Sequence, residues 1–113
     1  MKRLLTAAAI TLAVLSAKAE DTSSGNFLLK ACQSAVDNGT DWYSGYCLGL
    51  VDGLSAETVA LGIACIPEQV TKGQIERVVL KYLQDRPQDL NLGAQMLAIK
   101  AIGTAWPCPT KKR

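Results

Sequence analysis

Apolar positions recur every three or four residues along most of this chain, a spacing that predicts helices. In the first such stretch Leu28 and Cys32 share one helical face, Asn26 can cap the start, and Asn38-Gly39 gives a stop. We expect four helices: roughly Asn26 to Asn38, one that starts after Thr40 or Asp41, one between Thr71 and Arg86-Pro87, and one from about Asp89 to Ala105.

The second expected helix carries small residues at regular intervals. Gly45, Gly49 and Gly53 are spaced by four, and Ala56 and Ala60 follow. Each glycine inside a helix costs about 0.5–1 kcal/mol relative to alanine, so the series suggests that another backbone approaches closely. Because apolar residues lie on most sides of this helix, we expect it to be the buried centre of the fold. The glycine face then fits packing within the bundle or, alternatively, contact with a second copy of the chain.

The third expected helix has the clearest start signal. Thr71 and Gln74 form a capping box, and Val70 and Ile75 are placed as the hydrophobic staple around it. An amphipathic pattern follows, and Arg86-Pro87 breaks it. The start of this helix is therefore predictable to about one residue.

The first 19 residues have the three parts of an export signal. A basic start at Lys2 and Arg3 leads into an apolar run from Leu4 to Leu15, and Ala17-Lys18-Ala19 matches the A-x-A pattern of a signal peptidase site. The apolar run is shorter than the roughly 20 residues needed to span a bilayer. We predict cleavage after Ala19 and a mature chain of residues 20–113 that forms one domain, without stable membrane insertion.

Cleavage changes the charge balance of the protein. The full chain has 12 basic and 10 acidic residues, and loss of Lys2, Arg3 and Lys18 leaves nine basic residues against the same 10 acidic ones. A nucleic-acid-binding domain needs an excess of basic residues. The composition therefore argues against a nucleic-acid partner.

The four cysteines, Cys32, Cys47, Cys65 and Cys108, are even in number and follow an export signal, which favours two structural disulfides. A zinc site is not expected, because the chain has no C-x-x-C pair and no histidine. Four cysteines permit three pairings. Two helical hairpins, one turning near Gly39-Thr40 and one near Pro87, would join Cys32 to Cys47 and Cys65 to Cys108. The predicted fold class is thus all-α, a small four-helix bundle of two hairpins held by two disulfides.

Catalytic groups are scarce in this chain. Without histidine the Ser-His-Asp and Cys-His arrangements cannot form, and cysteines in disulfides are not nucleophiles. Asp52 and Glu57 are five residues apart, which turns them about 140° from each other on one helix, a poor geometry for flanking a scissile bond. We expect no enzymatic activity, no metal site and no cofactor.

Several short motifs together resemble the Rap/Tai family of type VI secretion immunity proteins, over nearly the whole mature chain. The motifs are Gly25-Asn26-Phe27-Leu28-Leu29 before Cys32, Tyr46-Cys47-Leu48-Gly49 with Asp52-Gly53, Cys65-Ile66-Pro67 before Thr71-Lys72-Gly73-Gln74, and Trp106-Pro107-Cys108. The resemblance implies a periplasmic, all-helical, often dimeric protein that binds and occludes a peptidoglycan-cleaving amidase delivered by neighbouring bacteria.

Two loops are the expected contact elements for such a partner, the turn from Asp37 to Trp42 and the stretch from Leu61 to Gln69. Trp42 is a candidate anchor, with Asp41 beside it, and Glu68 could meet a basic active-site rim. The alternative is that Trp42 closes the end of the bundle and Glu68 is simply solvated.

A periplasmic chaperone of the acid-stress type is the main alternative function. Such a protein is also small, helical and disulfide-bonded, and it would expose apolar surface on acidification. Without histidine, its switch would rest on carboxylates near pH 4. A purely structural or envelope-binding role is a third, weaker possibility.

Overall fold

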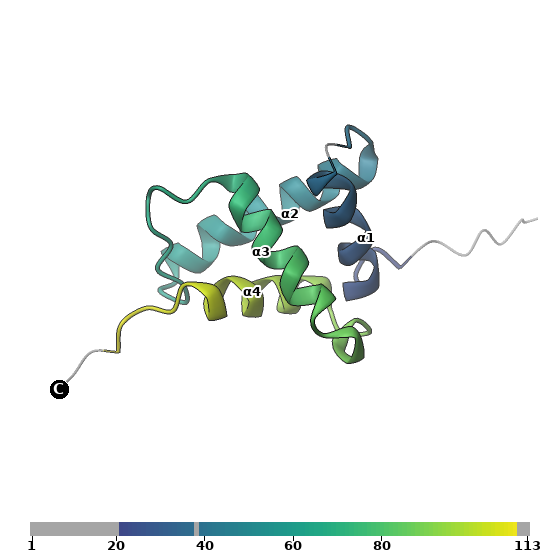
Figure 1. The fold of residues 1–113 in the computed structure, drawn as a ribbon. Coiled ribbons are helices and arrows are strands. Elements are labelled where there is room, and N and C mark those ends of the chain that lie inside the picture. The colour runs from purple at the N-terminus through teal and green to yellow at the C-terminus, as the bar shows by residue number, and fades with distance from the viewer. Residues whose placement is uncertain (1–20, 38, 111–113) are drawn as a thin grey trace, which may run out of the picture.

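The computed structural model describes residues 21–37 and 39–110 and confirms the all-α prediction. Within this part, four α-helices pack around one core, and a short 3-10 turn, η1, spans Pro87–Asp89 (Figure 1). The α-helices are α1 (Gly25–Val36), α2 (Trp42–Ala60), α3 (Lys72–Gln84) and α4 (Ala94–Ala105). The predicted signal segment, residues 1–19, lies outside the described residues. No helix in the described ranges combines the length and the apolar character needed to cross a bilayer.

Helix α3 starts where its sequence predicts. Thr71 is the N-cap, and its Oγ1 accepts a hydrogen bond from the Gln74 N–H at 3.1 Å. Ile75 is buried, and Val70 packs against the core, as the two members of a hydrophobic staple should. The side chain of the N-cap therefore satisfies one of the first free N–H groups of this helix.

The predicted cap of α1 is wrong. Ser24 is the N-cap, and its side chain accepts from the Phe27 N–H. The Asn26 side chain instead donates through Nδ2 to the carbonyl oxygen of Leu90, at 3.1 Å. At the other end α1 stops at Val36, before the expected Asn38-Gly39. Asn26 thus serves a long-range contact that local sequence grammar does not reveal.

The predicted start of the fourth helix is also wrong, because α4 begins at Ala94 rather than near Asp89. Backbone pairing between the N-terminal segment and this turn provides the reason. The Gly25 N–H donates to Leu92 O at 2.8 Å, and the Ala94 N–H donates to Ser23 O at 2.7 Å. Residues 90–93 therefore form a non-helical turn that is held against residues 23–26.

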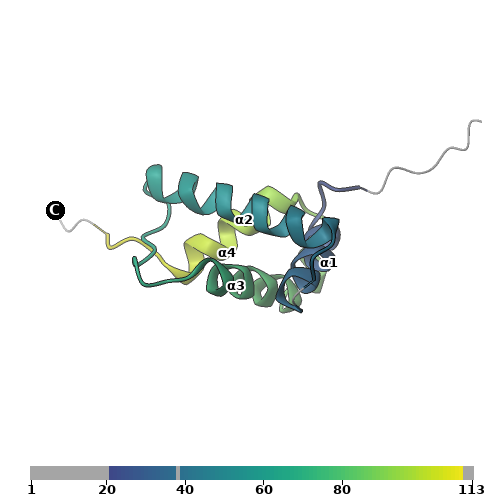
Figure 2. The ribbon, with the colours of Figure 1, turned by 90° about the horizontal axis from the view of Figure 1, so that it is seen from above.

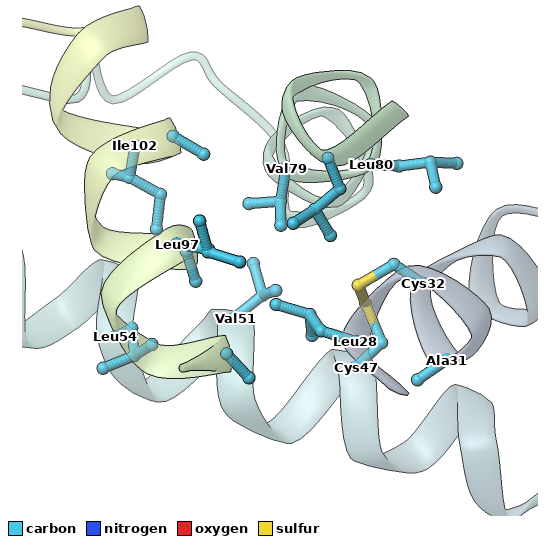
Figure 3. Close-up of a cluster of buried hydrophobic side chains, with 14 of the residues drawn as sticks. Leu28, Ala31, Cys32, Cys47, Val51, Leu54, Val79, Leu80, Leu97 and Ile102 are labelled. Atoms are coloured by element: carbon cyan, nitrogen blue, oxygen red, sulfur yellow. A yellow bond between two sulfur atoms is a disulfide. The ribbon is translucent and has the colours of Figure 1, made fainter. Parts of the chain in front are cut away.

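The core combines buried side chains from all four helices. Leu28, Val51, Val79, Leu97 and Ile102 are each 0–1% exposed and point into the same space (Figure 3). Burying such side chains supplies roughly 1.5–3 kcal/mol each, which is the main driving force for a bundle of this size. No buried side-chain nitrogen or oxygen within residues 21–37 and 39–110 lacks a hydrogen-bond partner.

Both predicted disulfides are present. Cys32 of α1 joins Cys47 of α2 across a Cα–Cα distance of 5.0 Å, and Cys65 joins Cys108 across 4.9 Å. The first bond lies in the core, where both cysteines are fully buried. The second ties the α2–α3 loop to the segment after α4, and these two segments lie at the same end of the molecule (Figure 1).

Helix α2 is not the buried centre that its composition suggests. It runs along one edge of the molecule, and α3 and α4 both lie on the same side of it (Figure 2). Its buried residues, among them Cys47, Val51 and Leu54, all lie on one face. Only three other helices are available in the described residues, and all of them pack against that face, so the opposite face stays open.

Candidate functional site

The outer side of α2 carries three of the six exposed large apolar side chains of the described residues. We call it the open α2 face. It combines small residues with large apolar ones that a soluble surface seldom displays together. Its exposed members are Trp42, Gly45, Leu48, Gly49, Gly53, Ala56, Val59 and Ala60. The sequence analysis did not identify Leu48 and Val59 as exposed residues. The signal that could have found them is that apolar residues occur on both sides of this helix, while only three other helices are expected to cover it.

The glycines of this face have no packing role inside the described chain. A Cβ atom built on Gly45, Gly49 or Gly53 would have no other group within 4 Å. Packing of these glycines within the bundle, one of the two readings of the sequence, is therefore wrong. The helix still bears their cost in stability, about 0.5–1 kcal/mol each. No packing contact within residues 21–37 and 39–110 offsets that cost.

Trp42 stands at the N-terminal end of the open α2 face. It is 62% exposed, yet ring contacts fix its position: the Phe27 ring centroid lies 5.5 Å away, edge-on, and the Tyr43 centroid 5.4 Å away. The Tyr46 ring is also near that of Trp42, and the two ring centroids are 6.0 Å apart. An exposed aromatic side chain held in one orientation loses little conformational entropy on binding, which suits an interface anchor.

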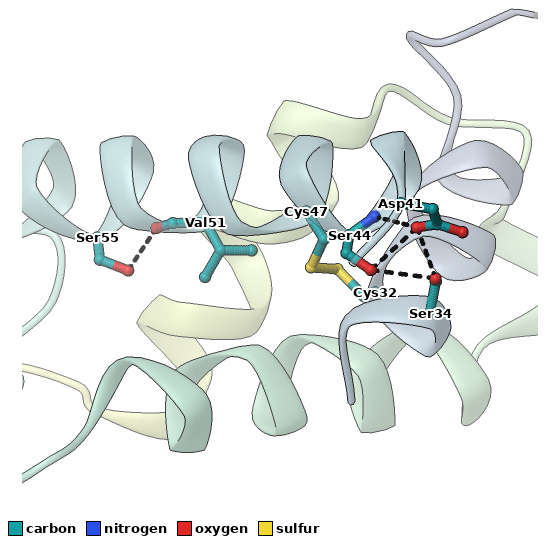
Figure 4. The surroundings of a disulfide bond; sticks show 7 residues. All are labelled: Cys32, Ser34, Asp41, Ser44, Cys47, Val51 and Ser55. Atoms are coloured by element: carbon teal, nitrogen blue, oxygen red, sulfur yellow. Dashed lines mark hydrogen bonds between the residues drawn. A yellow bond between two sulfur atoms is a disulfide. The ribbon is translucent and has the colours of Figure 1, made fainter. Parts of the chain in front are cut away.

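Asp41, the second predicted contact residue, is engaged in the start of α2. Its Oδ1 accepts from the Ser44 N–H at 2.9 Å, from Ser44 Oγ at 3.0 Å and from Ser34 Oγ at 2.9 Å (Figure 4). The backbone hydrogen bond from Ser44, followed by that from the Ser34 hydroxyl, lowers the pKa of this carboxyl. Through these hydrogen bonds Asp41 orders the turn before α2 and so orients the backbone at Trp42.

The far end of α2 closes with a Schellman motif. Gly62 has a φ of 71° and its N–H donates to Val59 O, while the Ile63 N–H donates to Thr58 O at 2.9 Å. Leu61 and Ile63 flank this glycine and are 66% and 45% exposed. Gly62 with an apolar residue after it was the sequence signal for this motif, and the sequence reasoning did not use it.

Glu68, the third predicted contact residue, lies beyond this motif in the loop between α2 and α3, and it is exposed. Helix α2 has 19 residues and so spans about 28 Å. Trp42 and Asp41 are therefore at one end of α2, and Glu68 lies in the loop that leaves from the other end, after Leu61 and Ile63.

Charged groups of both signs lie where α2 meets α3. Asp52 pairs with Lys72 of α3 at 3.2 Å on the surface. Next to them Glu76 is only 5% exposed, and its pKa is raised by desolvation and then by the negative charge of Asp52, while Arg77 opposes the shift. Neither Asp52 nor Glu76 lines either of the two hollows described below.

Sites for small ligands are weak in the described ranges. One shallow hollow, of about 430 Å³, is lined by uncharged residues that include Tyr46 and Gln95, and another, of about 200 Å³, includes Asn26 and Lys30. Among the residues that the structure describes, no group of three or more Asp, Glu, Cys or His side chains could hold a metal ion. The open α2 face and its two ends therefore suit contact with a protein better than binding of a small molecule or metal.

A known protein family matches most of this chain. The model of a family described as Rap1a immunity proteins matches residues 24–108, well over half of the chain. This range contains all four helices, both disulfides and the open α2 face. No curated protein and no solved structure matches the chain.

Proposed function

The chain belongs to the Rap1a immunity protein family, and we propose that it acts in the periplasm by binding and blocking a peptidoglycan-cleaving amidase effector of a type VI secretion system. The family match over residues 24–108 is the observation that carries this proposal. Export follows from the predicted signal segment, and both disulfides suit an oxidising compartment. In this role the protein is an inhibitor and has no catalytic activity of its own.

The loop end of the molecule is the surface that we assign to the amidase. Leu61 and Ile63 expose apolar side chains there, and Glu68 adds a negative charge. The Schellman motif and the Cys65–Cys108 disulfide hold the two sides of this loop in place before any partner arrives. A preorganised loop loses little entropy on docking, which favours tight inhibition.

We assign the open α2 face to a second copy of the chain. An antiparallel pair of α2 helices would cross near their midpoint, where Gly49 and Gly53 let the two backbones approach closely. Trp42 of each copy would then pack against the end of the other helix that carries the small residue Ala60. This arrangement buries the exposed Leu48 and Val59 and offsets the helical cost of the glycines.

Co-expression tests the inhibitory role. An amidase encoded beside this gene, exported to the periplasm, should lyse cells, and co-expression of the wild-type chain should prevent lysis. Leu61→Asp with Glu68→Lys should restore lysis, because both changes act at the loop end. Met96→Asp is the matched control, since Met96 is an exposed apolar residue of α4. Equal lysis with and without the wild-type chain would contradict the proposal for that amidase.

Light scattering in solution tests the dimer. The wild-type mature chain should have twice the monomer mass, and Gly49→Arg should give the monomer. Gln88→Arg adds the same charge at an exposed position of η1 and should leave the dimer intact. A wild-type chain that stays monomeric at high concentration would contradict the proposed dimer, but it would not contradict the proposed inhibitory role.

A further inference from the structure

The two disulfides differ in how a reductant can reach them. Cys32 and Cys47 are both 0% exposed and lie between α1 and α2 in the core (Figure 3). Cys65 is exposed, and Cys108, which follows α4, is partly exposed. Thiol–disulfide exchange needs a thiolate to approach a sulfur atom directly, so access decides which bond reacts.

We propose that Cys65–Cys108 is a thiol–disulfide exchange site, opened by a dithiol reductant while Cys32–Cys47 stays intact. One thiolate of the reductant attacks a sulfur of the Cys65–Cys108 bond and displaces the other sulfur as a thiolate. The second thiol of the reductant then resolves the mixed disulfide. Two electrons pass to the protein, which gains two thiols, and the reductant leaves as its own disulfide.

Apart from this bond, the segments that it joins are held at three partly buried side chains, Ile66, Val70 and Trp106, which pack against the core. The Cys65 N–H donates to Trp106 O at 2.8 Å, and Ile63 packs beside Gly103. Beyond Cys65, Pro67 and Glu68 are exposed, and the turn there has one local hydrogen bond, from the Val70 N–H to Pro67 O at 3.1 Å. Opening the bond therefore loosens residues 65–69 and residues 107–110, which lie outside these core contacts for most of their length.

The bundle itself does not depend on this bond in the same way. Cys32–Cys47 and the apolar core join all four helices independently of the loop. Reduction at Cys65–Cys108 is thus a local opening, of the kind that low-stability segments undergo while the core stays folded. This regulatory consequence rests on the proposed function: the loosened loop is the one assigned to the amidase, so reduction would release the inhibited enzyme.

Timed reduction of the oxidised mature chain tests the exchange site. Dithiothreitol is the dithiol probe, free thiols are alkylated at intervals, and peptides are mapped without reduction. Cys65 and Cys108 should be labelled at least about ten-fold faster than Cys32 and Cys47, since an opening free energy of about 1.4 kcal/mol for the buried bond suffices for that ratio. Hydrogen exchange should rise in residues 65–69 and stay slow in α1. Equal labelling rates, or faster labelling of Cys32 and Cys47, would overturn the inference.

A serine pair separates this inference from the proposed function. Cys65→Ser with Cys108→Ser mimics the opened state without exposing the amidase to a reductant. It should keep the helical circular dichroism signal and bind the amidase at least ten-fold more weakly than the oxidised wild type. Equal binding by both forms would remove the regulatory consequence. Failure of the oxidised wild type to bind at all would count against the proposed function, while the labelling order still decides the exchange site.

Discussion

At the scale of single residues, two glycines occupy opposite environments. A Cβ on Gly25 would clash with the Leu97 side chain and come within 2.9 Å of Leu90 O, a backbone atom that cannot move aside. A Cβ on Gly49 would meet nothing within 4 Å. The same residue type is therefore required by packing at one position and tolerated at a cost at the other.

Alanine at these two positions should change stability in opposite directions. Gly25→Ala should lower the free energy of unfolding by about 1–3 kcal/mol through overpacking. Gly49→Ala should raise it by about 0.5–1 kcal/mol, because alanine favours the helix, when the monomer is measured. Urea denaturation of the oxidised chain at low concentration measures both values. A loss of stability in Gly49→Ala would show that the face is packed in the folded monomer.

Glu76 gives a pH dependence whose sign can be worked out. Its pKa is raised in the folded state, from an ordinary value of 4.5, by desolvation and by Asp52. The folded state therefore binds this proton more tightly, and the resulting stability is present below pH 4.5 and lost as pH rises through the folded pKa. Protonation of Glu76 therefore stabilises the folded state. An acid-triggered chaperone requires the opposite, a folded state that acid destabilises.

Glu76→Gln should remove this dependence. The variant should be more stable than the wild type at pH 7 and equal to it at pH 3, where Glu76 is protonated. Unfolding free energies from urea titrations at both pH values measure the difference. Glu57→Gln changes an exposed carboxyl of α2 and serves as the control. A larger gain for Glu76→Gln at pH 3 than at pH 7 would contradict the assigned cause.

At the scale of elements, local rules succeeded where partners are close in sequence. The start of α3 depends on Thr71 and Gln74, three residues apart, and the sequence predicted it. The start of α4 depends on backbone bonds between residues 23–26 and 90–94, so propensity and capping preferences could not locate it. The start of α1 has a local cap, from Ser24 to the Phe27 N–H, which a capping rule could have found if Asn26 had not been preferred.

Removing the α3 cap should have a measurable cost. Thr71→Ala should lower the free energy of unfolding by about 1 kcal/mol, because the Gln74 N–H loses its side-chain partner. Thr104→Ala, at an exposed position in the last turn of α4, is the matched control and should not lower it. Thermal or urea unfolding of both variants gives the comparison, and equal effects would show that the cap contributes nothing.

At the scale of the whole molecule, the order of helices and cysteines was enough to predict the fold class and both disulfides. Hairpins bring Cys32 to Cys47 and Cys65 to Cys108 whatever the exact helix ends. The open α2 face could not be predicted in the same way. An apolar helix such as α2 looks the same in sequence whether its second side is covered by its own chain or left for a partner, as Val51 and Val59 illustrate.

A second copy on the open α2 face makes stability depend on protein concentration. Association favours the folded dimer over unfolded monomers, so a ten-fold increase in concentration adds about 1.4 kcal/mol per dimer at 25 °C and should raise Tm by about 3–5 °C. Gly49→Arg should abolish this dependence, because an arginine at the crossing point prevents the two backbones from approaching. Scanning calorimetry over a ten-fold concentration range measures the shift. A wild-type Tm that is independent of concentration would leave the cost of the three glycines in α2 without a partner to offset it.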